Sequence, residues 1–165
     1  MDLRTRLDRM DQHIAGFMRR GGLPALRLAL AVIFVWFGLL KPLGLSPAEP
    51  LVLATVQNLP VFSPHAWLAL IGWWELAIGL TFLHRATIRI AIALLGLQML
   101  GTFLPLVTLP DVTFQPGRIP YGLTMEGQYI VKNLLIIAAA LVIGGTVRGK
   151  QRITTAPDAT ASVST

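Results

Sequence analysis

An acidic side chain inside an apolar segment is the feature of this sequence that points most directly to chemistry. Glu75 lies near the middle of the run IGWWELAIGL, which carries no other charged residue. A carboxylate in hydrocarbon is costly unless it faces protein or is protonated, so a residue of this kind is a functional candidate. Two interpretations stay open. The carboxyl group either locks helix packing, or it handles protons or binds a ligand.

Two lysines lie at the ends of apolar segments, where an amine can approach such a carboxylate. Lys132 begins the fourth apolar segment, and an ion pair between Lys132 and Glu75 is the arrangement we favour. In the alternative, the lysine extends outward to the lipid headgroups. For Lys132 both arrangements stay open, whereas for Lys41, which precedes Pro42, the outward arrangement is preferred.

Two amide side chains fall within the apolar segments as well. Gln98 lies near mid-depth in the third segment, where it can meet Glu75 or the neighbouring indoles. Asn133 can form a further interhelical hydrogen bond. Amides at such positions serve more often to hold helices together than to catalyse a reaction.

Three tryptophans lie away from the interfacial belt in which membrane proteins usually place this residue. They are Trp36, Trp73 and Trp74. We expect some of them to face an interior cavity able to hold a flat apolar ligand, and ordinary core packing is the alternative. Close helix approach is expected at five glycines, namely Gly38, Gly72, Gly79, Gly96 and Gly101.

Several kinds of chemistry find no support in the residues. The absence of cysteine removes disulfides, iron–sulfur ligation and thiol nucleophiles. His65 and His84 fall near opposite ends of one expected helix, about 28 Å apart at ~1.5 Å per residue, so they do not share a metal. No nucleotide loop, metal-ligand cluster, serine nucleophile motif or paired carboxylate site is visible. We predict no metal site and no covalently bound cofactor.

Composition and segment length place these residues in a membrane. Hydrophobic residues make up 54% of the 165-residue chain, charged residues 13%, and the mean hydropathy is +0.65. Four apolar segments span about residues 23–44, 66–83, 88–109 and 128–145. Each is long enough to cross the hydrocarbon core, where backbone hydrogen bonding requires helices. The sequence therefore predicts an all-α, integral membrane four-helix bundle.

The flanking segments have different characters. Residues 1–22 place apolar side chains at helical spacing between charged ones, which is typical of an amphipathic helix on the membrane surface. Gly21-Gly22 is expected to break this helix before the bundle domain of residues 23–145. Residues 146–165 are expected to form a disordered tail.

Charge distribution predicts the orientation. Of the 14 Lys and Arg residues, 11 lie on one side of the four segments, and only Lys41, Arg118 and Lys132 lie on the other. The basic side should be cytoplasmic, with both termini there. The net charge of +6 is spread between apolar runs, so no nucleic-acid partner is expected.

Both outer loops are long. The first should hold a short interfacial or re-entrant helix between Pro50 and Pro60, and the second should be stiffened by four prolines.

Three stretches together carry a family resemblance: VIFVWFGLLKPLG, GWWELAIGL and EGQYIVKNLLIIAAALVIGG. Over about Leu26 to Gly145 the chain resembles the DoxX family of small bacterial membrane proteins. The resemblance implies a four-helix, multi-pass protein of the bacterial cytoplasmic (inner) membrane. Its relatives include the DoxD-type membrane subunit of thiosulfate:quinone oxidoreductase and components of redox-stress membrane complexes. By this likeness Glu75, Lys132 and Asn133 match the family's polar positions, and the outer loops are the docking surface.

Three functional hypotheses follow. The first is a small membrane subunit of a redox or respiratory complex, which binds a quinone-like lipid within the bundle and contacts other membrane subunits. Such a protein need not be an enzyme on its own, and it can serve a quinone-linked oxidoreductase as an accessory subunit. The second is a structural or assembly subunit without a ligand. The third is a transporter for a small solute, although four helices enclose little volume.

Overall fold

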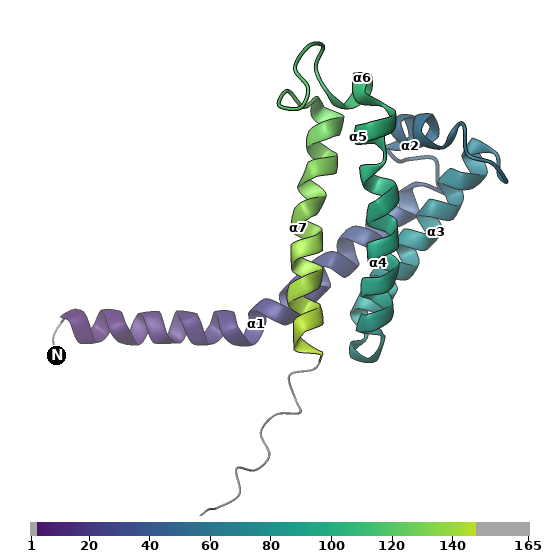
Figure 1. Cartoon of the computed structure of the whole chain (residues 1–165). Coiled ribbons are helices and arrows are strands. Elements are labelled where there is room, and N and C mark those ends of the chain that lie inside the picture. Colours follow the sequence, from purple (N-terminus) through teal and green to yellow (C-terminus); the bar gives the residue numbers. More distant parts are fainter. Residues whose placement is uncertain (1–2, 148–165) are drawn as a thin grey trace, which may run out of the picture.

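The computed structural model describes residues 3–147, and within this range the chain is helical apart from its loops and one isolated bridge between Phe114 and Leu123. Figure 1 shows the order of the elements. They are α1 (Leu3–Leu40), α2 (Glu49–Val56), α3 (Pro64–Leu83), the 3-10 turn η1 (Arg85–Thr87), α4 (Ile88–Phe103), α5 (Pro105–Thr108), α6 (Pro110–Thr113) and α7 (Met125–Thr146). The tail expected to be disordered lies outside the described residues from residue 148 onward.

Four stretches of helix in the described part of the chain are long and apolar enough to cross a membrane. They are Arg6–Leu40, Pro64–Leu83, Arg85–Thr108 and Met125–Thr146. Each of the four predicted segments lies largely within one of them, so the all-α architecture with four helices of membrane length is confirmed. Ser63 caps α3, because its hydroxyl oxygen accepts the Ala66 N–H at 3.3 Å, and Pro64 follows at the first helical position.

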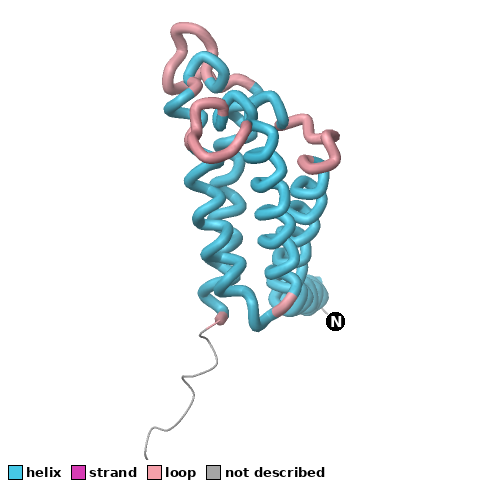
Figure 2. Tube along the Cα trace, turned by 90° about the vertical axis from the view of Figure 1, so that its right-hand side faces the viewer, coloured by secondary structure: helices cyan, strands magenta, loops and turns pink. Residues whose placement is uncertain are grey.

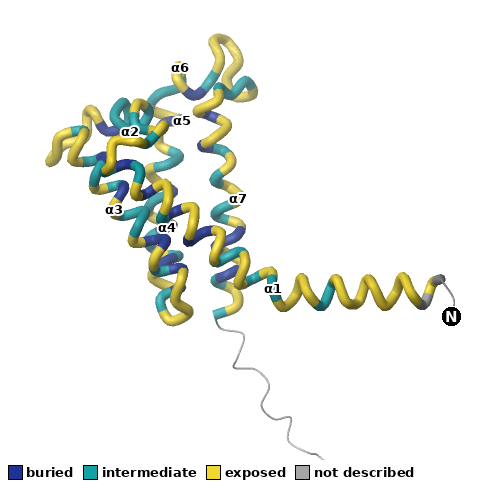
Figure 3. The backbone as a smooth tube through the Cα atoms, turned by 180° about the vertical axis from the view of Figure 1, so that it is seen from behind, coloured by how far each residue is buried: buried dark blue, intermediate teal, exposed yellow. Residues whose placement is uncertain are grey.

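The predicted helix break at Gly21-Gly22 is wrong. α1 runs without interruption for 38 residues and includes Pro24. Glycine lowers helix stability by about 1 kcal/mol relative to alanine, but it does not exclude the helical conformation. The N-terminal half of α1 extends sideways from the bundle and is almost entirely exposed, as the yellow tube in Figure 3 shows.

α1 and α3 pack most closely, and glycines explain why. A Cβ atom added at Gly38 would lie 2.8 Å from the Gly72 carbonyl oxygen, and one added at Gly72 would lie 2.8 Å from the Gly38 carbonyl oxygen. A Cβ atom added at Gly79 would likewise lie 2.8 Å from the Ala31 carbonyl oxygen. The predicted close approach is therefore confirmed at these three glycines. It is wrong at Gly96 and Gly101, where a Cβ would find nothing within 4 Å.

The hydrophobic core occupies the end of the bundle near η1. It is built from the middle of α1, the end of α3, the start of α4 and the end of α7, and its most deeply buried members are Ala31, Ile78, Phe82, Ala91, Leu95 and Ile143. Arg27 joins two helices at this end, since its guanidinium donates to the carbonyls of Phe82 and Leu83 at 3.0 and 3.1 Å. The bundle is therefore tightly packed near η1.

The opposite end carries the two long loops, shown at the top of Figure 2. The predicted short helix of the first loop is α2, which ends before Pro60. In the second loop, Pro105 and Pro110 open the short helices α5 and α6. Side chains then tie this loop to the start of α7, because Thr124 donates to the Val112 carbonyl at 2.7 Å. Figure 1 shows that α2, α5 and α6 lie together at this end.

Candidate functional site

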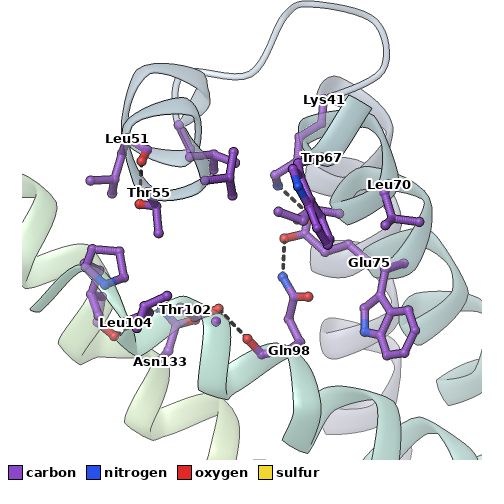
Figure 4. A pocket seen from close by; sticks show the side chains of 18 of the residues that line it. Lys41, Leu51, Thr55, Trp67, Leu70, Glu75, Gln98, Thr102, Leu104 and Asn133 are labelled. Carbon is purple, nitrogen blue, oxygen red and sulfur yellow. Dashed lines mark hydrogen bonds and ion pairs between the residues drawn. The ribbon is translucent and has the colours of Figure 1, made fainter. Parts of the chain in front are cut away.

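A cluster of three polar side chains joins α1, α3 and α4. Glu75 forms an ion pair with Lys41 through Oε2 and accepts a hydrogen bond from Gln98 Nε2 through Oε1 at 3.0 Å. The side chains of Lys41 and Glu75 are only 7% and 13% exposed. Figure 4 shows that the three groups meet at one wall of a pocket. The predicted contact between Gln98 and Glu75 is confirmed.

The predicted ion pair between Glu75 and Lys132 is wrong, as is the outward placement of Lys41. The close contact of α1 and α3 decides the partner: a Cβ at Gly38 would lie 3.0 Å from the Glu75 Cβ, so the end of α1 lies beside this carboxylate. Lys132 is exposed instead, and its ammonium lies 5.0 Å from the centre of the Tyr129 ring. That distance allows a cation–π interaction.

The end of α1 fixes the position of Lys41. Gly44 has a φ of +68°, and the Leu45 N–H donates to the Leu40 carbonyl at 2.9 Å while the Gly44 N–H donates to the Lys41 carbonyl at 3.1 Å. This pattern is a Schellman motif, in which a glycine with positive φ ends the helix. Lys41 therefore lies in an ordered final turn, and its side chain can be held against α3.

The cluster borders a cavity of about 480 Å³ between the packed core and α2. Apolar side chains from α2, α3 and α4 form most of the wall, and the polar cluster lies on one side of it. The hydroxyls of Thr55 and Thr102 also line the cavity, and they donate to the carbonyls of Leu51 and Gln98 at 2.6 and 3.0 Å. The cavity thus offers hydrocarbon surface with a local group of hydrogen-bonding atoms.

Two tryptophans line the cavity. Trp74 is one of the three expected there, and its indole N–H donates to the Leu94 carbonyl at 3.2 Å. Trp67, which the sequence did not single out, is the other. Its buried indole N–H has no hydrogen-bond partner among the described residues. Trp36 and Trp73 lie outside this cavity and are exposed.

Asn133 also lines the cavity from α7, but its expected interhelical hydrogen bond is not what the structure shows. Its amide nitrogen donates within the same helix, to the carbonyls of Tyr129 and Ile130 at 3.0 and 3.1 Å. Of the residues predicted for the site, the structure therefore brings Glu75, Gln98, Trp74 and Asn133 to one cavity.

Fold and site together indicate a class: a helical membrane protein whose bundle encloses a mainly apolar cavity with a buried ion pair in its wall. No family model matches the chain, and neither a curated protein nor a solved structure matches it. The resemblance to the DoxX family therefore stays a prediction from its three sequence stretches.

Proposed function

We propose that this protein is a small subunit of a redox or respiratory membrane complex and that it binds a quinone-like lipid in the cavity beside Glu75. The observation that carries the proposal is the placement of the Lys41–Glu75–Gln98 cluster in the wall of an otherwise apolar cavity. Ligand sites commonly combine apolar walls with a few polar groups that fix orientation. The redox context comes from the resemblance to the DoxX family.

The hydrogen-bonding capacity of the cavity suits a molecule that carries acceptors. An ammonium group has three N–H donors and a primary amide has two. Lys41 and Gln98 each direct a donor to Glu75, which leaves further donors for a ligand. The carbonyl oxygens of a quinone accept such bonds, and its flat ring fits beside indole rings.

The same proposal includes an orientation in the bacterial cytoplasmic membrane. The N-terminal half of α1, η1 and the end of α7 lie at one end of the bundle (Figure 1). Most of the basic residues lie in or next to these segments in the sequence. The positive-inside rule places this end in the cytoplasm with both termini. The exposed N-terminal half of α1 then lies on the inner membrane surface. The loops with α2, α5 and α6 face outward and contact partner subunits.

A structural role is the second candidate, because the cluster joins three helices. In that case Glu75 only holds α1, α3 and α4 together, and the cavity has no specific ligand. A quinone-binding assay separates the two roles.

Replacing Gln98 with Leu tests the ligand-binding proposal. A short-chain benzoquinone should quench the tryptophan fluorescence of the wild-type protein in nanodiscs in a saturable manner. Loss of one hydrogen bond is worth about 1–1.5 kcal/mol, so Gln98→Leu should weaken binding about tenfold. Gln128→Leu is the matched control, since Gln128 is exposed on α7 and does not line the cavity. Quenching without saturation in the wild-type protein would favour the structural role.

A further inference from the structure

The cavity is covered at both ends, and its sides lie between the helices. α2 lies across its outer end, where Leu51 and Thr55 line it (Figure 4). The packed core fills the bundle toward η1. Access along the bundle axis is therefore obstructed in both directions, and the sides between the helices decide how a ligand reaches Glu75.

The gap between α3 and α4 is one open side of the cavity. Leu70 from α3 and Leu97 from α4 both line the cavity, and both are exposed on the outer surface of the bundle. Gly101 lies one turn beyond Leu97 on α4. It also lines the cavity and is exposed, and a Cβ atom added there would meet nothing within 4 Å. These three residues frame a lateral window.

The window has a defined lower edge. The Trp74 indole N–H donates to the Leu94 carbonyl at 3.2 Å, which joins α3 to α4 one helical turn below Leu97. Above this hydrogen bond the cavity-lining residues of α3 and α4 that are exposed are two leucines and a glycine. The window therefore admits hydrocarbon and offers nothing that would hold a polar chain.

From this geometry, and resting on the proposed function, we infer that the ligand is a long-chain amphiphile. It enters from the bilayer through the window framed by Leu70, Leu97 and Gly101. Its polar head lies at the Lys41–Glu75–Gln98 cluster and its chain leaves between α3 and α4 into the lipid. A chain in this position stays in hydrocarbon along its length, so it needs no room inside the small cavity.

The test compares two tryptophan substitutions on α4. Gly101→Trp places an indole in the window, whereas Gly96→Trp is the matched control. Gly96 is exposed on the same helix with nothing within 4 Å of an added Cβ, and it does not line the cavity. Binding of a polyprenyl quinone and of a short-chain benzoquinone is measured with both variants and the wild-type protein in nanodiscs, by displacement of a radiolabelled quinone.

We expect Gly101→Trp to weaken binding of the polyprenyl quinone several-fold more than binding of the short-chain quinone, and Gly96→Trp to change neither. If the wild-type protein binds both quinones and Gly101→Trp affects them equally, the window is wrong while the proposed function stands. If the wild-type protein binds neither quinone, the proposed function fails, and the inference fails with it.

Discussion

Lys41→Met should destabilise the protein by about 3–5 kcal/mol, because it removes one partner of a buried ion pair and leaves the carboxylate of Glu75 without its countercharge. Methionine preserves most of the side-chain length, so the loss of charge dominates the loss of packing. The free energy of unfolding is measured by denaturant titration of the protein in mixed micelles.

Two further variants make this prediction specific. The double substitution Lys41→Met with Glu75→Gln should recover much of the lost stability, since it leaves no buried charge unpaired. Lys132→Met should change the free energy of unfolding by only about 0.5 kcal/mol, because Lys132 is exposed. If Lys41→Met and Lys132→Met changed the free energy of unfolding equally, the pairing of Glu75 with Lys41 would be contradicted and an ion pair with Lys132 would be favoured.

Gly79→Val should separate α1 from α3 and cost about 1–3 kcal/mol, the usual range for overpacking a close contact. A Cβ at this glycine would lie 2.7 Å from the Val35 backbone nitrogen and 2.8 Å from the Ala31 carbonyl oxygen. Both neighbours are backbone atoms, so the helices themselves must move. The measurement is again the free energy of unfolding.

Gly96→Val is the control for this substitution. It introduces the same side chain into α4, where nothing lies within 4 Å of an added Cβ. Because the two variants share the same change in helix propensity, any difference between them reports the contact of α1 with α3. A cost for Gly96→Val as large as that for Gly79→Val would show that the contact of α1 with α3 does not explain the effect.

Much of the fold was predictable because membrane helices are recognised by length and composition alone. The predicted segments at residues 66–83 and 128–145 fall within α3 and α7. The continuity of α1 through Gly21-Gly22 was not predictable from glycine content, because glycine weakens a helix without ending it.

The partner of Glu75 was harder to predict because it depends on which helices touch. Lys41 and Lys132 had comparable positions along the bundle axis, and no pattern within a single helix shows which of them pairs with Glu75. A usable signal was present: Gly38 precedes Lys41 by three residues, and Gly72 precedes Glu75 by three. Since residues three apart share a helix face, a close contact at the two glycines turns both charged side chains toward the same interface.

The tryptophans show a similar limit. Trp73 and Trp74 are consecutive in the sequence, and consecutive residues on a helix point about 100° apart, so both cannot face one cavity squarely. Trp74 lines the cavity and Trp73 is exposed. Trp67 lies near the start of α3, and its place in the cavity follows from α2, which folds over the outer end of the bundle. Only tertiary structure supplies that contact.

Photoaffinity labelling locates the quinone site on the protein directly. A polyprenyl quinone with a photoreactive group on its ring is added to membranes that contain the protein, and the labelled peptides are mapped by mass spectrometry. We expect labels at the cavity wall, near Trp67, Trp74 and Gln98, and we expect excess unlabelled quinone to remove them. Labels confined to lipid-facing positions such as Leu135 and Leu141, unchanged by competitor, would contradict this expectation.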